Sequence, residues 1–195
     1  VNGLLPQSVA VRWAREVPDA FHARFGAVRR TYDYWILNDP VRAPLAHARA
    51  GWVFRPLDAT AMHEAAARLV GRHDFTSFRS AECQAASPVR ELYELSVARR
   101  GRLIRVRASA NAFLHHMIRN IVGTLVYVGL GRHDPAWTVE VLEARDRSRA
   151  APTFSPAGLY LARVEYDPSF LLPAPSATVP VWLDAYPDQD LRTDP

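Results

Sequence analysis

The chain has 195 residues, of which 49% are hydrophobic and 23% are charged, a balance that is typical of a folded globular protein and argues against disorder. No apolar run approaches the roughly 20 residues that a membrane-spanning helix needs, and the single cysteine, Cys83, excludes a disulfide or a two-thiolate zinc site within these residues. We therefore expect a soluble, cytoplasmic protein of one domain or two small ones.

The cationic charge is carried by arginine alone, and it is unevenly distributed. All 24 cationic side chains are arginines, and residues 166–195 hold five aspartates and one arginine, so that residues 1–165 carry a net charge of +8. A GC-rich genome is sufficient to explain the arginine bias. Clusters such as Arg29–Arg30 and Arg105–Arg107 nevertheless favour a polyanionic partner, because guanidinium groups bind phosphates bidentately and stack on bases.

The start of the chain has no signal-peptide pattern, since no basic stretch precedes an apolar core. The segment Asn2–Leu5, followed by Pro6, is typical of the end of a helix, so we expect the chain to begin inside a domain.

The first half of the chain is predicted to form two strands and one helix. The expected elements are a strand over Ser8–Val17, an irregular or short helical link over residues 21–28, a strand over Arg30–Leu37, a loop over Asn38–His47, and a helix that Asp58 caps and Gly71 ends.

The second half is predicted to contain a hairpin, two helices and a last strand. We expect a polar loop over residues 72–88, strands over Val89–Arg99 and Leu103–Ala110 joined at Arg100–Gly101, helices over Phe113–Val128 and Ala136–Ala144, and a strand over Leu159–Tyr166. In the second hairpin strand Arg105 and Arg107 alternate with apolar residues, which predicts one cationic face. Together the pattern predicts an α+β fold with a mostly antiparallel sheet flanked by helices.

Five segments, in this order, resemble the bacterial tRNA pseudouridine synthase A family: RTYDYWILN (30–38), GRHDFTSFR (71–79), CQAASPVR (83–90), ANAFLHHMIRNIVGTLVYVG (110–129) and DRSRAAPTFSPAGLYL (146–161). The resemblance implies a pseudouridine-synthase-like fold without its N-terminal strands. It makes residues 1–166 the C-terminal part of the family's catalytic chain. Residues 167–195 are then an acidic, proline-rich tail that we expect to be extended or disordered.

The resemblance also implies the reaction. Members of this family convert uridine to pseudouridine at positions 38, 39 and 40 of the tRNA anticodon arm, without a cofactor or metal and as homodimers. The C1′–N1 bond breaks, the uracil turns, and C5 forms the new bond to C1′. The base must leave its stack to be reached, so the pocket needs an aromatic platform and a cationic anchor.

The family's catalytic aspartate lies in a Gly-Arg-Thr-Asp-Ala-Gly-Val-His motif, and these 195 residues do not contain that motif. Three segments match part of it, namely Gly71–Asp74, Gly131–Asp134 and Arg192–Asp194, but none continues with Ala-Gly-Val-His, and we assign the nucleophile to none of them. We expect the motif upstream of Val1. The alternative is a truncated, inactive fragment that only binds RNA, because covalent catalysis without its nucleophile retains only binding.

Two residues match the family's reaction centre. Tyr32 matches the active-site tyrosine, whose ring can stack on uracil and whose hydroxyl can move a proton; the alternative is an ordinary strand aromatic. Arg119 matches the arginine that pairs with the catalytic aspartate. It lies beside an apolar helix stripe that includes Ile121 and Leu125, and the alternative is a surface helix arginine.

The remaining candidates are expected to bind substrate. Leu159 matches an aliphatic residue that lines the uracil pocket, although a plain core position fits it equally well. Arg79 and Arg90 flank the segment around Cys83, and they either contact phosphates or are ordinary surface arginines. His115 and His116 are expected to pack or to face RNA, because neighbours on a helix diverge by about 100° and cannot readily chelate one metal ion. A metal hydrolase that uses these histidines is the weakest alternative.

Overall fold

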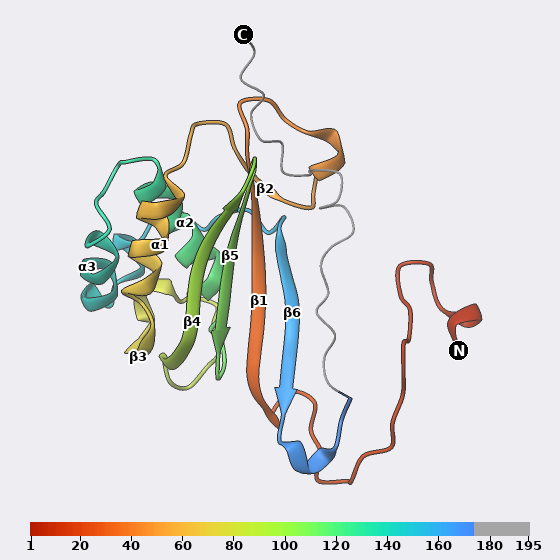
Figure 1. The fold of residues 1–195 in the computed structure, drawn as a ribbon. Coiled ribbons are helices and arrows are strands. Elements are labelled where there is room, and N and C mark those ends of the chain that lie inside the picture. Colours follow the sequence, from red (N-terminus) through yellow and green to blue (C-terminus); the bar gives the residue numbers. More distant parts are fainter. Residues whose placement is uncertain (174–195) are drawn as a thin grey trace.

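The structure, a computed structural model, describes residues 1–173, and its centre is a mixed sheet of six strands (Figure 1). The strands are β1 (Ala27–Asn38), β2 (Gly51–Val53), β3 (Gly71–Asp74), β4 (Val89–Arg100), β5 (Leu103–Ala110) and β6 (Leu159–Tyr166). The helices are α1 (Ala59–Ala67), α2 (Met117–Gly129) and α3 (Trp137–Ala144). This is the expected α+β architecture.

Strand β1 organises the sheet because it pairs along both of its edges. Along one edge it runs antiparallel to β5, from Arg30 opposite Ala110 to Leu37 opposite Leu103. Along the other edge β6 pairs antiparallel with residues 27–34, and β2 then pairs in parallel with residues 36–38. Strands β4 and β3 continue the sheet beyond β5, both antiparallel. All pairs except β1–β2 are therefore antiparallel, as expected.

The three helices cover one face of the sheet and enclose the main core (Figure 1). Eleven of the thirteen residues of α2 are buried, because its sequence is apolar around almost its whole circumference. Alternate residues of β1 and β5, such as Tyr34, Ile36, Ile104 and Val106, point into this core and are at most 1% exposed.

The opposite face of the sheet carries a small apolar cluster and a polar region. Trp35, Leu37 and Leu103 pack there against Ala46 and Ala50 of the segment between β1 and β2. Towards the other end of β1, Arg107 donates two hydrogen bonds to the Asp33 carboxylate, of 2.7 and 2.8 Å. These bonds raise the pKa of Arg107. The expected cationic face of β5 is thus partly neutralised by β1.

The predicted strands and helices of the second half are largely confirmed. Strand β6 has the predicted bounds, β4 and β5 form the predicted hairpin, and α3 begins one residue later than predicted. Asp58 caps α1 as expected, since its side chain accepts hydrogen bonds from the Thr60 and Ala61 amides. Of the expected tail, residues 168–170 form a 3-10 turn, and residues 174–195 lie outside the described residues, so the prediction for them stays a prediction.

Four predictions about secondary structure are wrong. Helix α1 ends at Ala67 and not at Gly71, which is instead the first residue of β3. Residues Ser8–Val17 form no strand. They are exposed, and no described strand pairs with them, so the alternation of apolar and polar residues there has no partner strand to hydrogen-bond with. Residues 72–88 are not only a polar loop, because β3 lies at their start and Phe75 and Phe78 are fully buried in the core. Helix α2 starts at Met117 instead of Phe113, since His116 has a left-handed backbone (φ 61°) that ends the helix on its N-terminal side.

Candidate active site

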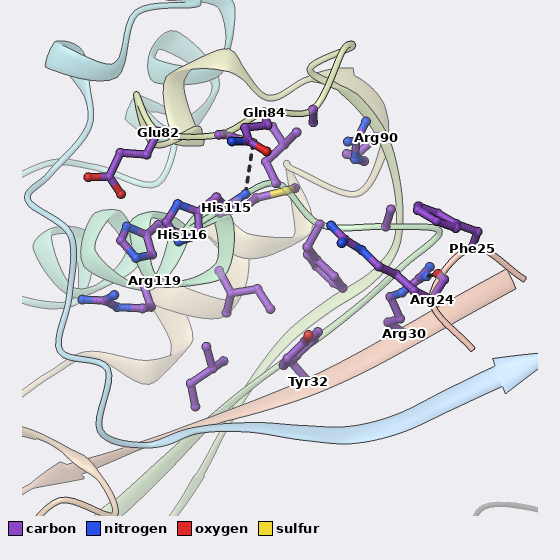
Figure 2. A pocket seen from close by; sticks show the side chains of 18 residues that line it. Arg24, Phe25, Arg30, Tyr32, Glu82, Gln84, Arg90, His115, His116 and Arg119 are labelled. Atoms are coloured by element: carbon purple, nitrogen blue, oxygen red, sulfur yellow. Dashed lines mark hydrogen bonds between the residues drawn. The ribbon is translucent and has the colours of Figure 1, made fainter. Parts of the chain in front are cut away.

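A pocket of about 960 Å³ lies where β1 and β6 meet the N-terminal end of α2 and the segment around residues 82–85 (Figure 2). It contains six of the seven residues predicted to form the site: Tyr32, Arg90, His115, His116, Arg119 and Leu159. These residues come from four separate elements, so only the fold brings them together. Figure 2 shows Glu82, His115, His116 and Arg119 along one side of the pocket and Arg24, Arg30 and Arg90 along the other.

Tyr32 and Leu159 supply the apolar part of the pocket. Tyr32 is half-buried in β1, and the ring of Phe113 meets it edge-on, with ring centroids 5.3 Å apart at 87°. Its hydroxyl donates no hydrogen bond to the rest of residues 1–173. Tyr34, two residues further on, is fully buried, and its hydroxyl donates to the Ser155 carbonyl at 2.7 Å. Burial raises the pKa of Tyr34. Of the two tyrosines, only Tyr32 therefore offers a free hydroxyl to a ligand in the pocket.

Arg119 is half-buried on the first turn of α2. Its Nε donates a 2.8 Å hydrogen bond to the Phe154 carbonyl, and no carboxylate in the described part of the chain forms an ion pair with it. The two terminal nitrogens of the guanidinium group therefore remain available to an anionic ligand. A carboxylate bound there would gain a charge-assisted, bidentate partner.

Arg119 is held in place by the segment 150–156, which packs along α2. Thr153 donates a 2.7 Å hydrogen bond to Asn120, and Arg147 donates to both of these side chains. Asn120 is fully buried and also donates to the Phe78 carbonyl. At Gly123 the chains come so close that an added Cβ would overlap the Pro152 carbonyl oxygen. These contacts fix the Phe154 carbonyl that orients Arg119.

The two histidines lie at the start of α2, where their rings stack with centroids 3.9 Å apart. His115 is exposed and His116 is half-buried. Burial lowers the pKa of His116, and the neighbouring His115 and Arg119 lower it further, while Glu82 partly opposes them. His116 is therefore neutral at pH 7. No group of three or more His, Cys, Asp or Glu side chains suited to a metal ion is found in residues 1–173.

Arg79 and Arg90 flank the segment around Cys83, but they have different surroundings. Arg79 does not line the pocket; it donates hydrogen bonds to the carbonyls of Cys83 and Ala85, of 2.5 and 2.8 Å, and so holds this segment in shape. Arg90 does line the pocket, and its Nε is buried without a hydrogen-bond partner in the described chain. Desolvation accordingly lowers the pKa of Arg90. A buried donor without a partner is unusual, so Arg90 is held there at a cost.

Cys83 is buried, as expected for a small core residue. Burial raises the pKa of its thiol, but hydrogen bonds from the Ala85 and His115 amides and the charge of Arg79 outweigh burial and lower it. The sulfur accepts the His115 amide at 3.3 Å, so it ties the segment around residue 83 to the start of α2.

Sequence reasoning missed several residues of the pocket, among them Arg24, Phe25 and Arg30. Arg30 donates to the carbonyls of Ala27 and Asn111 and also to that of Arg24, and the Arg24 guanidinium lies over the Phe25 ring. One signal could have found Arg30, because in an extended strand it shares a face with Tyr32. Nothing local marks Arg24 and Phe25, which lie in an irregular segment.

The partial matches to the aspartate motif lie away from the pocket. Asp74 accepts hydrogen bonds from the amide and hydroxyl of Thr76, and Asp134 accepts from the amides of Ala136 and Trp137 at the start of α3. Neither residue lines the pocket. The third match, 192–194, lies outside the described residues. Both described aspartates accept hydrogen bonds within local turns.

None of the helices in residues 1–173 is long and apolar enough to cross a membrane.

Residues 65–167 match the family described as tRNA pseudouridine synthase. A protein named tRNA pseudouridine synthase A from Paraburkholderia phymatum is 56% identical over 188 residues, which are 94% of this chain and 70% of that relative. Proteins of the same name from Burkholderia mallei and Burkholderia thailandensis are each 55% identical, over 98% of this chain and 71% of their own lengths.

The matches cover more than half of the chain, and the relatives are similar along nearly all of it. The chain therefore belongs to the tRNA pseudouridine synthase family, a family of isomerases that form pseudouridine in tRNA.

Proposed function

We propose that this protein converts uridine to pseudouridine in the anticodon arm of tRNA, at positions 38–40, in the pocket between β1, β6 and α2. The observation that supports this most directly is the half-buried Arg119, which has a carbonyl partner on Nε and no carboxylate partner in the described chain. An arginine in such a position is stabilised by a carboxylate, because an unpaired charge out of water is costly.

In this proposal the nucleophile is an aspartate that these 195 residues do not contain. It pairs with Arg119 and attacks C1′ of the bound uridine, forming an ester bond to C1′ as the C1′–N1 bond breaks and the uracil leaves as an anion. The uracil then turns, its C5 attacks C1′ and displaces the aspartate carboxylate, C5 loses its proton, and N1 gains one. Tyr32 stacks on the base, its hydroxyl is placed to accept or return a proton, and Leu159 forms the apolar wall against which the ring turns.

The basic residues around the pocket are proposed to hold the RNA. Arg30 and Arg90 line the wall opposite Arg119, and His115 is exposed beside it (Figure 2). His116 is neutral at pH 7 and is proposed to donate or accept a hydrogen bond, whereas Arg79 acts through the segment that it supports. We further propose that the protein acts in the cytoplasm as a homodimer, as the resemblance implies.

The proposal is tested with tRNA labelled with tritium at C5 of uridine, because formation of the new bond releases that label. The protein expressed from its complete gene is expected to release tritium from the anticodon arm, and replacement of uridines 38–40 by cytidine is expected to abolish release. The alternative, a fragment that only binds RNA, predicts binding of tRNA by residues 1–195 without release of tritium. Full-length protein that binds tRNA and releases no tritium would overturn the proposal.

A further inference from the structure

A second basic and aromatic surface lies at the far end of the sheet from the pocket. It consists of Arg42, Trp52, Phe54 and Arg55, and we call it the sheet-end patch. The Arg42 guanidinium lies 4.8 Å from the centroid of the Trp52 ring, and the Arg55 guanidinium lies 5.7 Å from that of Phe54. The two rings are 6.0 Å apart. Arg42 and Arg55 are exposed, and Phe54 is 55% exposed.

Two parts of the sheet-end patch, Trp52 and the backbone at Arg55, are anchored to the fold although the patch faces solvent. The inner side of Trp52 packs against the small cluster of Trp35, Leu37 and Leu103, and its Nε1 donates to the Asp39 carbonyl at 2.8 Å. Asn38 donates a 2.7 Å hydrogen bond to the Arg55 carbonyl. A surface that is ordered before binding loses less entropy when a ligand docks on it.

The guanidinium groups of the sheet-end patch are free to bind a ligand. Neither Arg42 nor Arg55 forms a side-chain hydrogen bond or ion pair within residues 1–173, apart from its contact with an aromatic ring. The sequence has three arginines and no carboxylate between Asp39 and Asp58. An arginine that is stacked on a ring keeps its planar donors available, and this arrangement suits phosphates together with bases.

The sheet-end patch is separate from the pocket. Trp52 is paired with Leu37 of β1, five residues beyond Tyr32, which corresponds to about 17 Å along the strand. The two sites also lie on opposite faces of the sheet, since Tyr32 packs with the helix-covered core and Trp52 with the small cluster. Because the sites also face opposite sides of the sheet, about 17 Å is a lower bound on their separation, and it already corresponds to roughly five stacked nucleotides. One nucleotide therefore cannot contact both sites, so a ligand that does must be a longer RNA.

A comparable aromatic group elsewhere has the wrong charge for RNA. His133 stacks on Trp137 with centroids 3.8 Å apart, and Arg132 lies over Tyr127. There, however, Asp134 lies next to His133 and Glu140 lies one helical turn beyond Trp137. Carboxylates so close to the rings repel phosphates, so this group serves as a matched control.

We propose that the sheet-end patch binds the tRNA substrate at a position remote from the target uridine. Arg42 and Arg55 contact phosphates, and Phe54 stacks on an unpaired base or packs on a ribose. This inference rests on the proposed function for the identity of the RNA. It adds a second contact that selects tRNA by its shape, and it leaves the chemical step to the pocket.

The test is the double variant Arg42→Gln/Arg55→Gln in the full-length protein, with Phe54→Ala as a second variant and Arg132→Gln as the control. The dissociation constant for unmodified tRNA is measured between 50 and 200 mM salt, together with kcat, KM and the sedimentation coefficient. We expect the double variant to bind about tenfold more weakly, with a log–log salt slope reduced by about 1.5 to 2. Phe54→Ala should weaken binding at least about fivefold. The values of kcat and the sedimentation coefficient should not change, and Arg132→Gln should match the wild type.

Three results would overturn the inference. Unchanged affinity and salt slope would show that the sheet-end patch does not touch RNA. An equal loss in Arg132→Gln would show only a general effect of charge. A smaller sedimentation coefficient would show that the surface joins two copies of the protein. The proposed function and this inference can fail separately. If the wild-type protein forms no pseudouridine, but the double variant still binds tRNA more weakly than the wild type, the proposed function is refuted and the RNA contact stands.

Discussion

Arg119 and Phe154 exchange hydrogen bonds in both directions. The Arg119 Nε donates to the Phe154 carbonyl at 2.8 Å, and the Phe154 amide donates to the Arg119 carbonyl at 3.2 Å. The pair joins α2 to the segment before β6, two parts of the chain that are 35 residues apart. It fixes the plane of the guanidinium group and leaves its outer nitrogens for a ligand.

Replacement of Arg119 should therefore abolish turnover without unfolding the protein. For Arg119→Ala in the full-length enzyme we expect kcat to fall by about 10²- to 10⁴-fold, roughly 3–5 kcal/mol in the activation free energy, because the catalytic carboxylate loses its charged partner. Arg119→Lys should recover little, since an ammonium group cannot form the same fork. Kinetics of tritium release measure the effect, and Arg149→Ala, an exposed arginine on the neighbouring turn, is the control. Near-normal kcat in Arg119→Ala would refute the assignment.

The close contact at Gly123 leads to a second prediction. In Gly123→Ala the new methyl group meets the backbone carbonyl of Pro152, so the segment 150–156 must move and carry the Phe154 carbonyl with it. We expect a loss of about 1–3 kcal/mol in the free energy of unfolding, measured by thermal denaturation. The fall in kcat should exceed the fall in tRNA affinity, because Arg119 loses its orientation. Gly3→Ala is the control, since nothing lies within 4 Å of a Cβ at that position. Unchanged stability would contradict the close contact.

The free hydroxyl of Tyr32 allows its ring and its proton to be tested separately. Tyr32→Phe keeps the ring and the edge-on contact with Phe113, so stability and tRNA affinity should stay close to wild type. If the hydroxyl moves a proton, kcat should fall by about 10²- to 10⁴-fold. Tyr32→Leu removes the platform as well and should add about 1–3 kcal/mol of lost binding to a stacked base. Equal kcat for Tyr32→Phe and wild type would limit Tyr32 to stacking.

His116 makes the stability of the protein depend on pH. Burial lowers the pKa of His116 below its ordinary value of 6.5, so the unfolded chain binds the proton more readily than the folded one. The contribution of neutral His116 to the free energy of unfolding is therefore complete above pH 6.5. It is lost as the pH falls through the lower pKa that His116 has in the folded protein. His116→Asn removes the titration and keeps a residue that tolerates positive φ. Between pH 7.5 and 5.5 the Tm of this variant should fall less than that of the wild type or of His47→Asn. An equal fall in Tm for the variant and the wild type would show that His116 is not the source of this pH dependence.

The parts of the fold that could be predicted from sequence are those whose signals are local. The hairpin of β4 and β5 and the last strand, β6, show alternation and clear turns, and α1 has its cap at Asp58. The wrong predictions depended on distant partners. Ser8–Val17 alternates but has no neighbouring strand, while Phe75 and Phe78 are buried in the core although the segment around them is polar.

Most of the candidate site could be named in advance only because the family resemblance links residues far apart in sequence. Spacing alone left Tyr32 as a strand aromatic and Arg119 as a helix arginine. The contacts that support Arg119, from Thr153 through Asn120 and from Pro152 at Gly123, involve backbone atoms and a close approach that no sequence pattern reveals. Arg24 and Phe25 lie in irregular chain, and their place in the pocket comes from the hydrogen bond between Arg30 and the Arg24 carbonyl.

Helix α2 is the most enclosed helix of the described fold, and it carries Arg119 on its first turn. We expect amides in such a helix to exchange hydrogen only when a large part of the protein opens, so that this wall of the pocket stays in place. In the proposed reaction the rearrangement would then fall to the nucleic acid, whose target nucleotide leaves its helix and whose detached ring turns against this wall. Hydrogen–deuterium exchange can test this expectation: deuterium uptake across α2 should be slow, and it should be the same with and without tRNA.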